Sequence, residues 1–305
     1  MSRKVQKPFI FDIHHGALDD GPGIRTTVFF KGCPLSCIWC HNPESMNCHR
    51  EIAFHSKFCM KCGDCLDVCP AGAVDLDSEQ RIRRDKCTFC GKCAEICPTT
   101  ALRFVGAFYS ATELVEILLK DRIFYKTSKG GVTFSGGEPL LYPDYLASVA
   151  KALKRKGVDI AIQTSGMFDL PEVQTSIFPY INSIYYDIKL FSNEEHIKYT
   201  GSPNGRILEN FIRLAGSRDV EIIPRVPLVP HITATRDNLA QIAGFLGSEG
   251  CRNYELLPYN SGGIEKRRLI GVPIPKEVTD LLLDMGEEKK WQDFFHEQFL
   301  ACHKR

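Results

Sequence analysis

The arrangement of the cysteines constrains this chain more than any other feature of its sequence. The chain of 305 residues contains 14 cysteines, and eleven of them fall into three groups with the spacing of metal ligands. In a cytosolic protein such spacing indicates metal centres rather than disulfides. Cys48, Cys251 and Cys302 lie outside the groups, and we expect them to be small buried or incidental thiols. Parts of the chain are therefore expected to fold around metal.

The first group is Cys33-x-x-x-Cys37-x-x-Cys40. Three thiolates can ligate three irons of a cubane, whereas a [4Fe-4S] cluster held in the usual way takes four. One iron would then stay open, and the amino and carboxylate groups of an amino acid could chelate it. The alternatives are plain buried thiols or a zinc site with His41, but a four-ligand zinc site would need a second Cys or His pair at a fitting distance. The spacing favours an iron-sulfur cluster with one open iron.

The other two groups form an internal repeat. Each is a Cys-x-x-Cys-x-x-Cys-x-x-x-Cys-Pro run, and a linker at 71–86 separates the two runs. The spacing resembles that of bacterial two-cluster ferredoxins, in which the fourth cysteine of each run ligates the other cluster. Two zinc sites are the alternative, and so small a segment would depend on its metal for stability. The resemblance implies one [4Fe-4S] cluster on Cys59, Cys62, Cys65 and Cys97 and another on Cys87, Cys90, Cys93 and Cys69.

The composition is that of an ordinary soluble globular protein, with 44% hydrophobic and 25% charged residues. The formal net charge of +1 gives no general attraction to nucleic acid or to an anionic membrane, so we expect neither as a partner. No apolar run approaches the roughly 18 residues of a membrane-spanning helix. The N-terminus has no apolar signal-peptide core. The protein is expected to be cytoplasmic.

Strands and helices alternate through the rest of the chain. The β-branched and aromatic run at 26–30 predicts a first strand that leads directly into the loop with Cys33. A capping box at Ser110 and Glu113 predicts the start of a helix, and Gly157 predicts the end of another. Further strands are predicted at 131–134, 159–163, 183–189, 221–226 and 254–257, and helices at about 144–156, 206–215, 239–246 and 275–285. Six strand-helix units predict a parallel α/β sheet.

Unusual residues stand at or just past the end of every predicted strand. Because the carboxyl ends of parallel strands meet at one edge of a sheet, these residues should converge on one site. A glycine pair or a charged loop residue has an ordinary explanation when taken alone. Together they favour one active site. Its residues are 33–40, 136–139, 163–166, Asp187, Lys189, Arg225 and 258–260.

Two of these motifs resemble known signatures. Cys33-x-x-x-Cys37-x-Trp39-Cys40 resembles the cluster motif of the radical S-adenosylmethionine (radical SAM) superfamily. The segments 20–26 and 28–33, with 40–43 after them, are similar to the signature of the activating enzymes of glycyl radical enzymes, such as those that activate pyruvate formate-lyase. Matching motifs recur to about Asn260, so the resemblance covers nearly the whole chain.

The resemblance implies a fold, cofactors and partners. Residues 1–47 and 106–305 would form a partial (β/α)6 TIM-like barrel, with a ferredoxin-like domain inserted at 48–105. The cofactors would be three [4Fe-4S] clusters and S-adenosylmethionine. The enzyme, an oxidoreductase, would cleave S-adenosylmethionine to a 5′-deoxyadenosyl radical, which takes an α-hydrogen from a glycine of a partner glycyl radical enzyme. That partner would be a dehydratase, a decarboxylase or a C-N or C-S lyase. An external donor such as flavodoxin or ferredoxin would supply electrons, which the inserted clusters relay unless they are structural or a docking surface.

The resemblance also implies roles for single residues. The catalytic ligands of the site cluster would be Cys33, Cys37 and Cys40, and glycines after a strand would let the backbone approach a ligand closely. Where members that activate pyruvate formate-lyase have a histidine and an aspartate, this chain has Asn260 and Gln163. Cofactor contacts are expected from Trp39, Cys40 and His41 at the adenine, from Gly136, Gly137 and Glu138 at the methionine amino end, from Asp187, Ile188, Lys189 and Arg225 at the ribose and carboxylate, and from Asn260.

Two other functions fit parts of the sequence. A non-catalytic electron carrier would explain the eight repeated cysteines but not the loop at 33–40. A radical enzyme acting on a small molecule would share the cofactor chemistry, but it gives no reason for the segment Asp20-Gly21-Pro22-Gly23, which could dock a glycine loop. The basic runs 81–84 and 266–268 are expected to be solvated surface, with partner contacts as the alternative.

Overall fold

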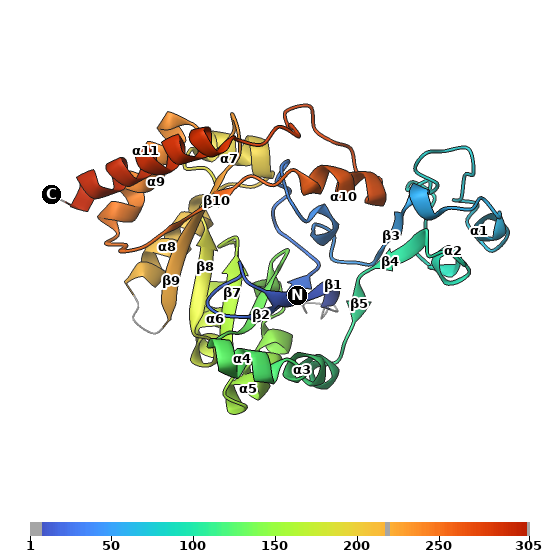
Figure 1. Ribbon diagram of the computed structural model, residues 1–305, viewed down its shortest axis with the longest axis horizontal. Helices are drawn as coiled ribbons and strands as arrows, with labels where there is room; N and C mark the ends of the chain where they lie inside the picture. Colours follow the sequence, from blue (N-terminus) through green and yellow to red (C-terminus); the bar gives the residue numbers. More distant parts are fainter. Residues whose placement is uncertain (1–7, 217–219, 304–305) are drawn as a thin grey trace.

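The larger part of the molecule is built on one sheet of eight strands (Figure 1). The computed structural model describes residues 8–216 and 220–303. Since each parallel strand pairs with the one before it in the chain, all the carboxyl ends lie on one edge. This is the predicted parallel α/β sheet. Its parallel strands are, in spatial order, β2 (Arg25–Phe30), β6 (Gly131–Gly136), β7 (Asp159–Thr164), β8 (Ser183–Asp187), β9 (Glu221–Leu228) and β10 (Glu255–Pro258).

The sheet curves into a partial barrel, with β10 at one edge and a short strand, β5 (Ala107–Phe108), at the other. The connecting helices pack their apolar sides on the sheet, where they build one large hydrophobic core. They are α3 (Ala111–Leu119), α4 (Arg122–Ser128), α5 (Pro143–Arg155), α6 (Leu170–Ser176), α7 (Asn193–Thr200), α8 (Gly205–Ala215) and α9 (Arg236–Ser248), with single turns η3 (Pro139–Leu141) and η4 (Phe178–Tyr180). The capping box of Ser110 and Glu113 is present at the start of α3, as predicted. No helix of the described residues is long and apolar enough to cross a membrane.

Two antiparallel strands at the edge of the sheet were not predicted. β1 (Phe9–Ala17) pairs with β2, and β5 pairs with the start of β1. Only the first half of β1 is rich in apolar residues. The exposed His14 and His15 and the shift in pairing near Ala17 break the alternation that identifies a strand in sequence. The strand order is therefore six parallel strands extended by two antiparallel ones.

Between β2 and β5 the chain makes a small second unit that projects from the barrel (Figure 1). Its two ends are held together by β3 (Glu51–Phe54) and β4 (Leu102–Val105), which pair antiparallel. The single turn η1 (Pro43–Ser45) precedes this unit, whose own short elements are η2 (Ser56–Phe58), α1 (Asp64–Asp67) and α2 (Lys92–Glu95). Because its separate apolar cluster is small and cysteines pack against it, most of this unit is organised around thiols.

The prediction of a last helix at 275–285 is wrong. This segment is irregular, and Leu281 and Leu282 are largely exposed. The helix begins only at the last residue of this segment, as α11 (Met285–His303), which packs on α9. Asp284 accepts from the backbone N–H of Glu287 at 2.8 Å, and the Glu287 carboxylate accepts from the N–H of Asp284 at 3.3 Å. This pair of side-chain bonds is an N-cap that fixes the start of the helix.

Candidate active site

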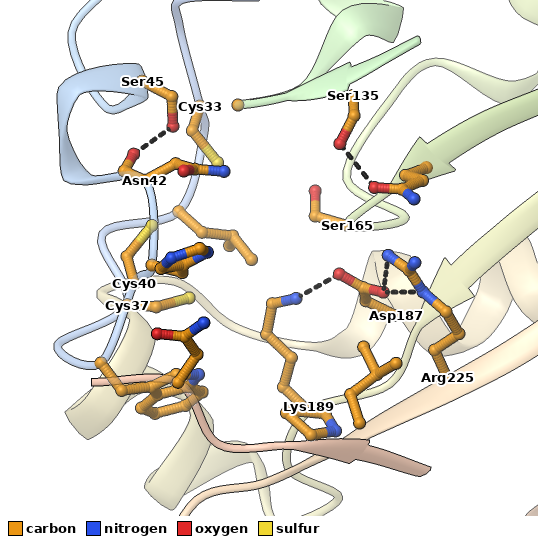
Figure 2. Close-up of a pocket in the computed structure, with 18 of the residues that line it drawn as sticks. Cys33, Cys37, Cys40, Asn42, Ser45, Ser135, Ser165, Asp187, Lys189 and Arg225 are labelled. Atoms are coloured by element: carbon orange, nitrogen blue, oxygen red, sulfur yellow. Dashed lines mark hydrogen bonds and ion pairs between the residues drawn. The ribbon is translucent and has the colours of Figure 1, made fainter. Parts of the chain in front are cut away.

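A cavity of about 290 Å³ lies at the carboxyl edge of the parallel strands (Figure 2). Every parallel strand, or the loop that follows it, contributes to its wall, so the predicted convergence on one site is confirmed by the structure. Among the residues that line it are Cys33, Cys37, Trp39, Cys40, His41, Gly136, Gly137, Gln163, Ser165, Asp187, Lys189, Arg225, Tyr259 and Asn260.

The loop with the three cysteines is fixed by backbone hydrogen bonds to two neighbours. Ser36 and Ile38 donate to the carbonyls of Thr200 and Tyr199, at 2.7 and 3.0 Å, at the end of α7. Cys33 donates to the carbonyl of Met46 at 3.2 Å. The loop is therefore held in a defined conformation on both sides, as a preorganised set of metal ligands requires.

The surroundings of the thiols of this loop disfavour the thiolate form unless positive charge lies nearby. Burial, and for Cys33 the neighbouring Cys37, raises the pKa of each thiol, to about 12 for Cys37. Lys189 opposes this effect at Cys37 and Cys40. Because thiolates are the metal-binding form, cations are the natural complement of such a buried thiol group.

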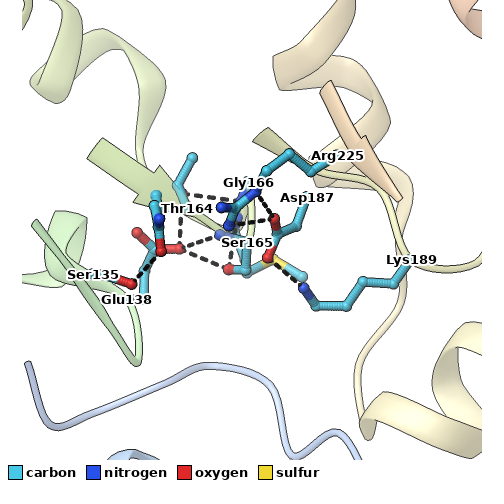
Figure 3. Close-up of polar contacts among 10 residues, drawn as sticks. Ser135, Glu138, Thr164, Ser165, Gly166, Asp187, Lys189 and Arg225 are labelled. Carbon is cyan, nitrogen blue, oxygen red and sulfur yellow. Dashed lines mark hydrogen bonds and ion pairs between the residues drawn. The ribbon is translucent and has the colours of Figure 1, made fainter. Parts of the chain in front are cut away.

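Asp187 contacts two cations on the side of the cavity opposite the cysteines (Figures 2 and 3). Its Oδ2 lies 2.8 Å from Nζ of Lys189, and its Oδ1 lies 3.0 and 2.9 Å from Nε and Nη2 of Arg225. Burial raises the pKa of Asp187, but the two cations outweigh it and the net shift is downward. Lys189 is also buried, which lowers its pKa, yet Asp187 and the thiol of Cys37 raise it to about 12. All three groups are therefore charged at neutral pH.

Glu138 supports the site from beneath rather than lining it. The side chain is fully buried, and its Oε2 accepts from Oγ of Thr164 at 2.8 Å and from N and Oγ of Ser165 at 2.9 and 2.7 Å (Figure 3). Oε1 accepts from the N–H of Leu140 at 3.2 Å. Burial raises the pKa of Glu138, and these bonds oppose the rise. The residue thus ties the end of β7 to the loop after β6.

The structure gives a packing reason for the glycines at 136 and 137, in addition to the predicted approach to a ligand. A Cβ on Gly136, whose φ is +105°, would lie 2.3 Å from the backbone N of Phe30, and a Cβ on Gly137 would lie 2.2 Å from the carbonyl oxygen of Gly32. The close approach is made by the backbone of β2 and its loop. These glycines therefore position the cysteine loop against β6, although both also line the cavity.

Gln163 connects the cavity to the motif at 20–25. Its Oε1 accepts from Oγ of Ser135 at 2.6 Å, and its Nε2 donates to Oδ1 of Asp20 at 2.8 Å. Oδ2 of Asp20 accepts from Oγ1 of Thr27 at 2.6 Å. Arg25 is fully buried and donates to Oγ1 of Thr133 at 2.7 Å. The loop before β2 thus reaches into the barrel and ends against the floor of the cavity.

Of the remaining candidates, Trp39, His41 and Asn260 line the cavity and Ile188 does not. Ile188 is 1% exposed and packs in the hydrophobic core, because its side chain points away from the edge that carries Asp187. Burial, together with Lys266, lowers the pKa of His41, so the imidazole is neutral at pH 7. Oδ1 of Asn260 accepts from the N–H of Gly262, the first residue of the next helix, at 2.9 Å.

That helix, α10 (Gly262–Ile270), supplies site residues that the sequence analysis missed. Arg267 is 5% exposed, and its Nη2 donates to the carbonyls of Cys37 and Ile38 at 3.1 and 3.0 Å. Lys266 donates to Oδ1 of Asn42 at 2.7 Å. Within the run 266–268, the expectation of a solvated basic surface holds for Arg268, which is exposed, and is wrong for Arg267. No pattern in the sequence connects residue 267 with a loop about 230 residues earlier.

The inserted unit brings its cysteines together in two places. A small cavity is lined by Cys59, Cys62, Cys65 and Cys97, together with Arg81. Cys93 lies close enough to Cys87, Cys69 and Cys90 for their charges to raise its pKa, to about 11, beyond the effect of burial. No three His, Cys, Asp or Glu side chains of the described chain are placed to hold a single metal ion. Thiols on the corners of a cubane are further apart than the ligands of one ion.

The fold and the site define a radical SAM protein. The model of the radical SAM superfamily matches residues 84–241, and that of the 4Fe-4S dicluster domain matches residues 58–101. Within that superfamily the chain belongs to the activating enzymes of glycyl radical enzymes, as the following relatives show.

The isethionate sulfite-lyase activating enzyme of Desulfovibrio desulfuricans is 38% identical over 289 residues, which are 90% of this chain and 92% of the relative. The trans-4-hydroxy-L-proline dehydratase activating enzyme of Clostridioides difficile is 40% identical over 264 residues, or 85% and 86% of the two chains. The crystal structure of a radical SAM methyltransferase from Sphaerobacter thermophilus is similar in fold, with a TM-score of 0.55 at 12% identity over 96% of this chain and 75% of that one. The resemblance found in the sequence is thereby confirmed.

Proposed function

We propose that Cys33, Cys37 and Cys40 hold a [4Fe-4S] cluster and that S-adenosylmethionine binds at its open iron, in the cavity they line. The observation that carries this proposal is that three thiols of one loop face the partly buried Asp187 and Lys189 and the buried Arg225 across a cavity of about 290 Å³. When bound, the cluster and S-adenosylmethionine supply a 5′-deoxyadenosyl radical that takes an α-hydrogen from a glycine of the partner.

The residues of the chain bind and orient the cofactor rather than exchange protons with it. Lys189 is the cation nearest the thiols and suits the carboxylate of S-adenosylmethionine, while Asp187 suits a ribose hydroxyl. Trp39 and the neutral His41 provide flat rings for the adenine. Glu138 acts through Thr164 and Ser165 as a positioning residue.

The relatives support the class of partner. Four of them activate a C-S lyase, a C-N lyase, a dehydratase and a decarboxylase, namely isethionate sulfite-lyase, choline trimethylamine-lyase, trans-4-hydroxy-L-proline dehydratase and indoleacetate decarboxylase. A glycyl radical enzyme of one of these types is the proposed protein substrate. The enzyme is proposed to work in the cytoplasm, with no role for nucleic acid or membrane.

The inserted domain, placed at 48–105, is proposed to hold two further [4Fe-4S] clusters. The two groups of thiols described above support the predicted assignment, with Cys59, Cys62, Cys65 and Cys97 around one cavity. These clusters relay electrons from a flavodoxin or a ferredoxin to the site cluster. The chain then carries three clusters in all.

The activity is tested by electron paramagnetic resonance. The reconstituted, reduced protein is mixed anaerobically with S-adenosylmethionine and candidate partners of the four types. A glycyl doublet with one partner, absent in a Cys37→Ala variant, is the expected result. Failure to cleave S-adenosylmethionine at all would leave the protein as an electron carrier and overturn the proposal.

The relay is tested with Cys62→Ala and Cys90→Ala, each of which removes a ligand of one inserted cluster. Turnover with flavodoxin or ferredoxin should fall at least tenfold, while turnover with a small chemical reductant that reaches the site cluster directly should be retained. Unchanged turnover with the protein donor would leave these clusters a structural role.

A further inference from the structure

The guanidinium of Arg84 is buried without a hydrogen-bond partner. Its Nε, Nη1 and Nη2 are all inaccessible to solvent, and none of the described residues accepts from them. An arginine side chain is always charged and carries five N–H donors. Leaving such a charge buried and unpaired is costly, so an acceptor that the protein side chains do not provide belongs at this place.

The surroundings of Arg84 indicate what that acceptor is. Burial lowers the pKa of Arg84, and the nearest opposing charges are those of Cys87, Glu51 and Cys93. A Cβ on Gly271, which ends α10, would lie 2.9 Å from Nε of Arg84. The guanidinium therefore lies beside two thiols of the second repeat, on the side where the inserted domain meets the barrel.

Arg81, three residues earlier, likewise lies beside the other group of thiols. It is 4% exposed, and its Nη2 donates to Sγ of Cys59 at 3.7 Å, in the cavity that Cys62 and Cys65 also line. Its φ of +60° is rare for a residue with a side chain, so the backbone at this position is in an unfavourable conformation. Each set of four cysteines thus has one buried arginine.

Arg83, between them in the same run, differs from both. Its side chain is 50% exposed and pairs with Asp75 at 3.0 Å. The run 81–84, expected to be solvated surface, is therefore divided: two arginines point inward to the thiols and one points to solvent.

We propose that Arg84 donates to sulfur of the cluster on Cys69, Cys87, Cys90 and Cys93 and raises its reduction potential, and that Arg81 does the same for the cluster on Cys59, Cys62, Cys65 and Cys97. This inference rests on the proposed function, which places clusters there. Uptake of one electron makes a cluster more negative without any proton. A fixed cation and N–H donors at its sulfurs stabilise the reduced form, which raises the potential.

The experiment is a redox titration of the reconstituted protein, without S-adenosylmethionine, followed by electron paramagnetic resonance with dithionite as the reductant. Arg84→Gln is expected to move the potential of one inserted cluster to a more negative value and to leave the other in place. Arg81→Gln should move the other cluster instead. Arg83→Gln, the matched control, should leave every potential at its wild-type value.

The inference is overturned if Arg84→Gln keeps its iron and all clusters titrate as in the wild type, or if both variants move the same cluster. If Arg84→Gln loses iron, the redox titration of Arg84→Lys is the deciding measurement. This variant keeps the charge and is expected to titrate near the wild type, so a clearly more negative potential contradicts the inference. A wild-type protein with the iron of one cluster alone would instead overturn the proposed function, and this inference with it.

Discussion

Asp187 is the residue on which the charged side of the cavity depends. It is the shared partner of Lys189 and Arg225, at 2.8 and 2.9 Å. Burial raises its pKa, but the two cations reverse the shift, and the pKa of Lys189 is held at about 12. The ion pairs are therefore intact over the whole pH range in which such an enzyme works.

Asp187→Asn should lower the free energy of unfolding by about 2 kcal/mol, less than the 3–5 kcal/mol of a fully buried pair because the side chain of Asp187 is 20% exposed. Denaturant unfolding of the anaerobic holoprotein measures it. Asp293→Asn, which breaks the exposed pair with Lys289, is the control and should change stability by less than about 0.5 kcal/mol.

The difference in unfolding free energy between the wild type and Asp187→Asn should depend on pH. A carboxylate with a lowered pKa in the folded state stabilises it above its ordinary pKa, and the contribution is lost as the pH falls through the lowered value. Lys189, with a raised pKa, contributes until the pH rises toward about 12. The difference between wild type and Asp187→Asn should be constant from about pH 5 to pH 9 and shrink below about pH 4. A difference that already shrinks between about pH 7 and pH 5 would contradict this.

The sequence identified the residues of the cavity but not the role of each. Spacing locates thiols, since all the ligands proposed for the site cluster, and three of the four for each inserted cluster, come from one short run. Spacing does not distinguish residues that line the cavity from buried residues that lie behind them. Glu138 and Ile188 are adjacent to cavity residues in the chain, yet one is buried under the cavity and the other in the core. That distinction depends on strand register and loop direction, which tertiary packing sets.

At the scale of elements, α10 packs against the back of the cysteine loop. Arg267 bonds two carbonyls of that loop, and the start of the helix lies directly on Cys40. Arg267→Met leaves both carbonyls unpaired at a cost of about 1.5–3 kcal/mol, so affinity for S-adenosylmethionine should fall roughly tenfold or more. Equilibrium binding to the reconstituted protein measures it. Arg268→Met, which loses only an exposed pair with Glu265, should bind as the wild type does.

Gly263→Ala tests the same contact through shape alone. A Cβ at this position would lie 2.1 Å from the carbonyl oxygen of Cys40, so the helix or the loop must move. The variant should retain less iron per chain at the site cluster and bind S-adenosylmethionine weakly. Gly205→Ala, at the start of α8, meets no atom within 4 Å and serves as the control. Equal iron and affinity in both variants would show that the contact is unimportant.

The elements were predicted unevenly, for a physical reason. The six parallel strands carry the strong signal of buried, β-branched runs that alternate with helices. β1 lies near the edge of the sheet and has an exposed half, and its sequence does not indicate that it pairs antiparallel. The segment 275–285 has helix-like apolar spacing, but Leu281 and Leu282 are largely exposed, so no burial stabilises a helix there. The helix begins only after the cap at Asp284.

In the whole molecule, a buried ion pair joins the inserted domain to the barrel. Lys31, at the end of β2, is fully buried and lies 2.8 Å from Glu51, the first residue of β3, which is also buried. Asn47 donates to the other oxygen of Glu51 at 2.7 Å. The pair stands two residues before Cys33 and holds the base of the insertion in place.

Glu51→Leu should destabilise the protein by about 3–5 kcal/mol, because it takes the contacting carboxylate away from the buried ammonium of Lys31 and leaves it the backbone carbonyl of Glu44. The double variant Lys31→Met, Glu51→Leu removes both charges and should recover most of the loss. Urea unfolding of the four proteins of the cycle measures the coupling. Additive effects of the two single changes would mean that the two residues do not act as a pair.

This junction bears on how the two parts of the chain can be separated. Excision of the ferredoxin-like segment would remove the carboxylate of Glu51 and leave the buried ammonium of Lys31 with the backbone carbonyl of Glu44 as its contact. A lineage that sheds the segment, or an engineer who builds a minimal activase, must change residue 31 in the same step.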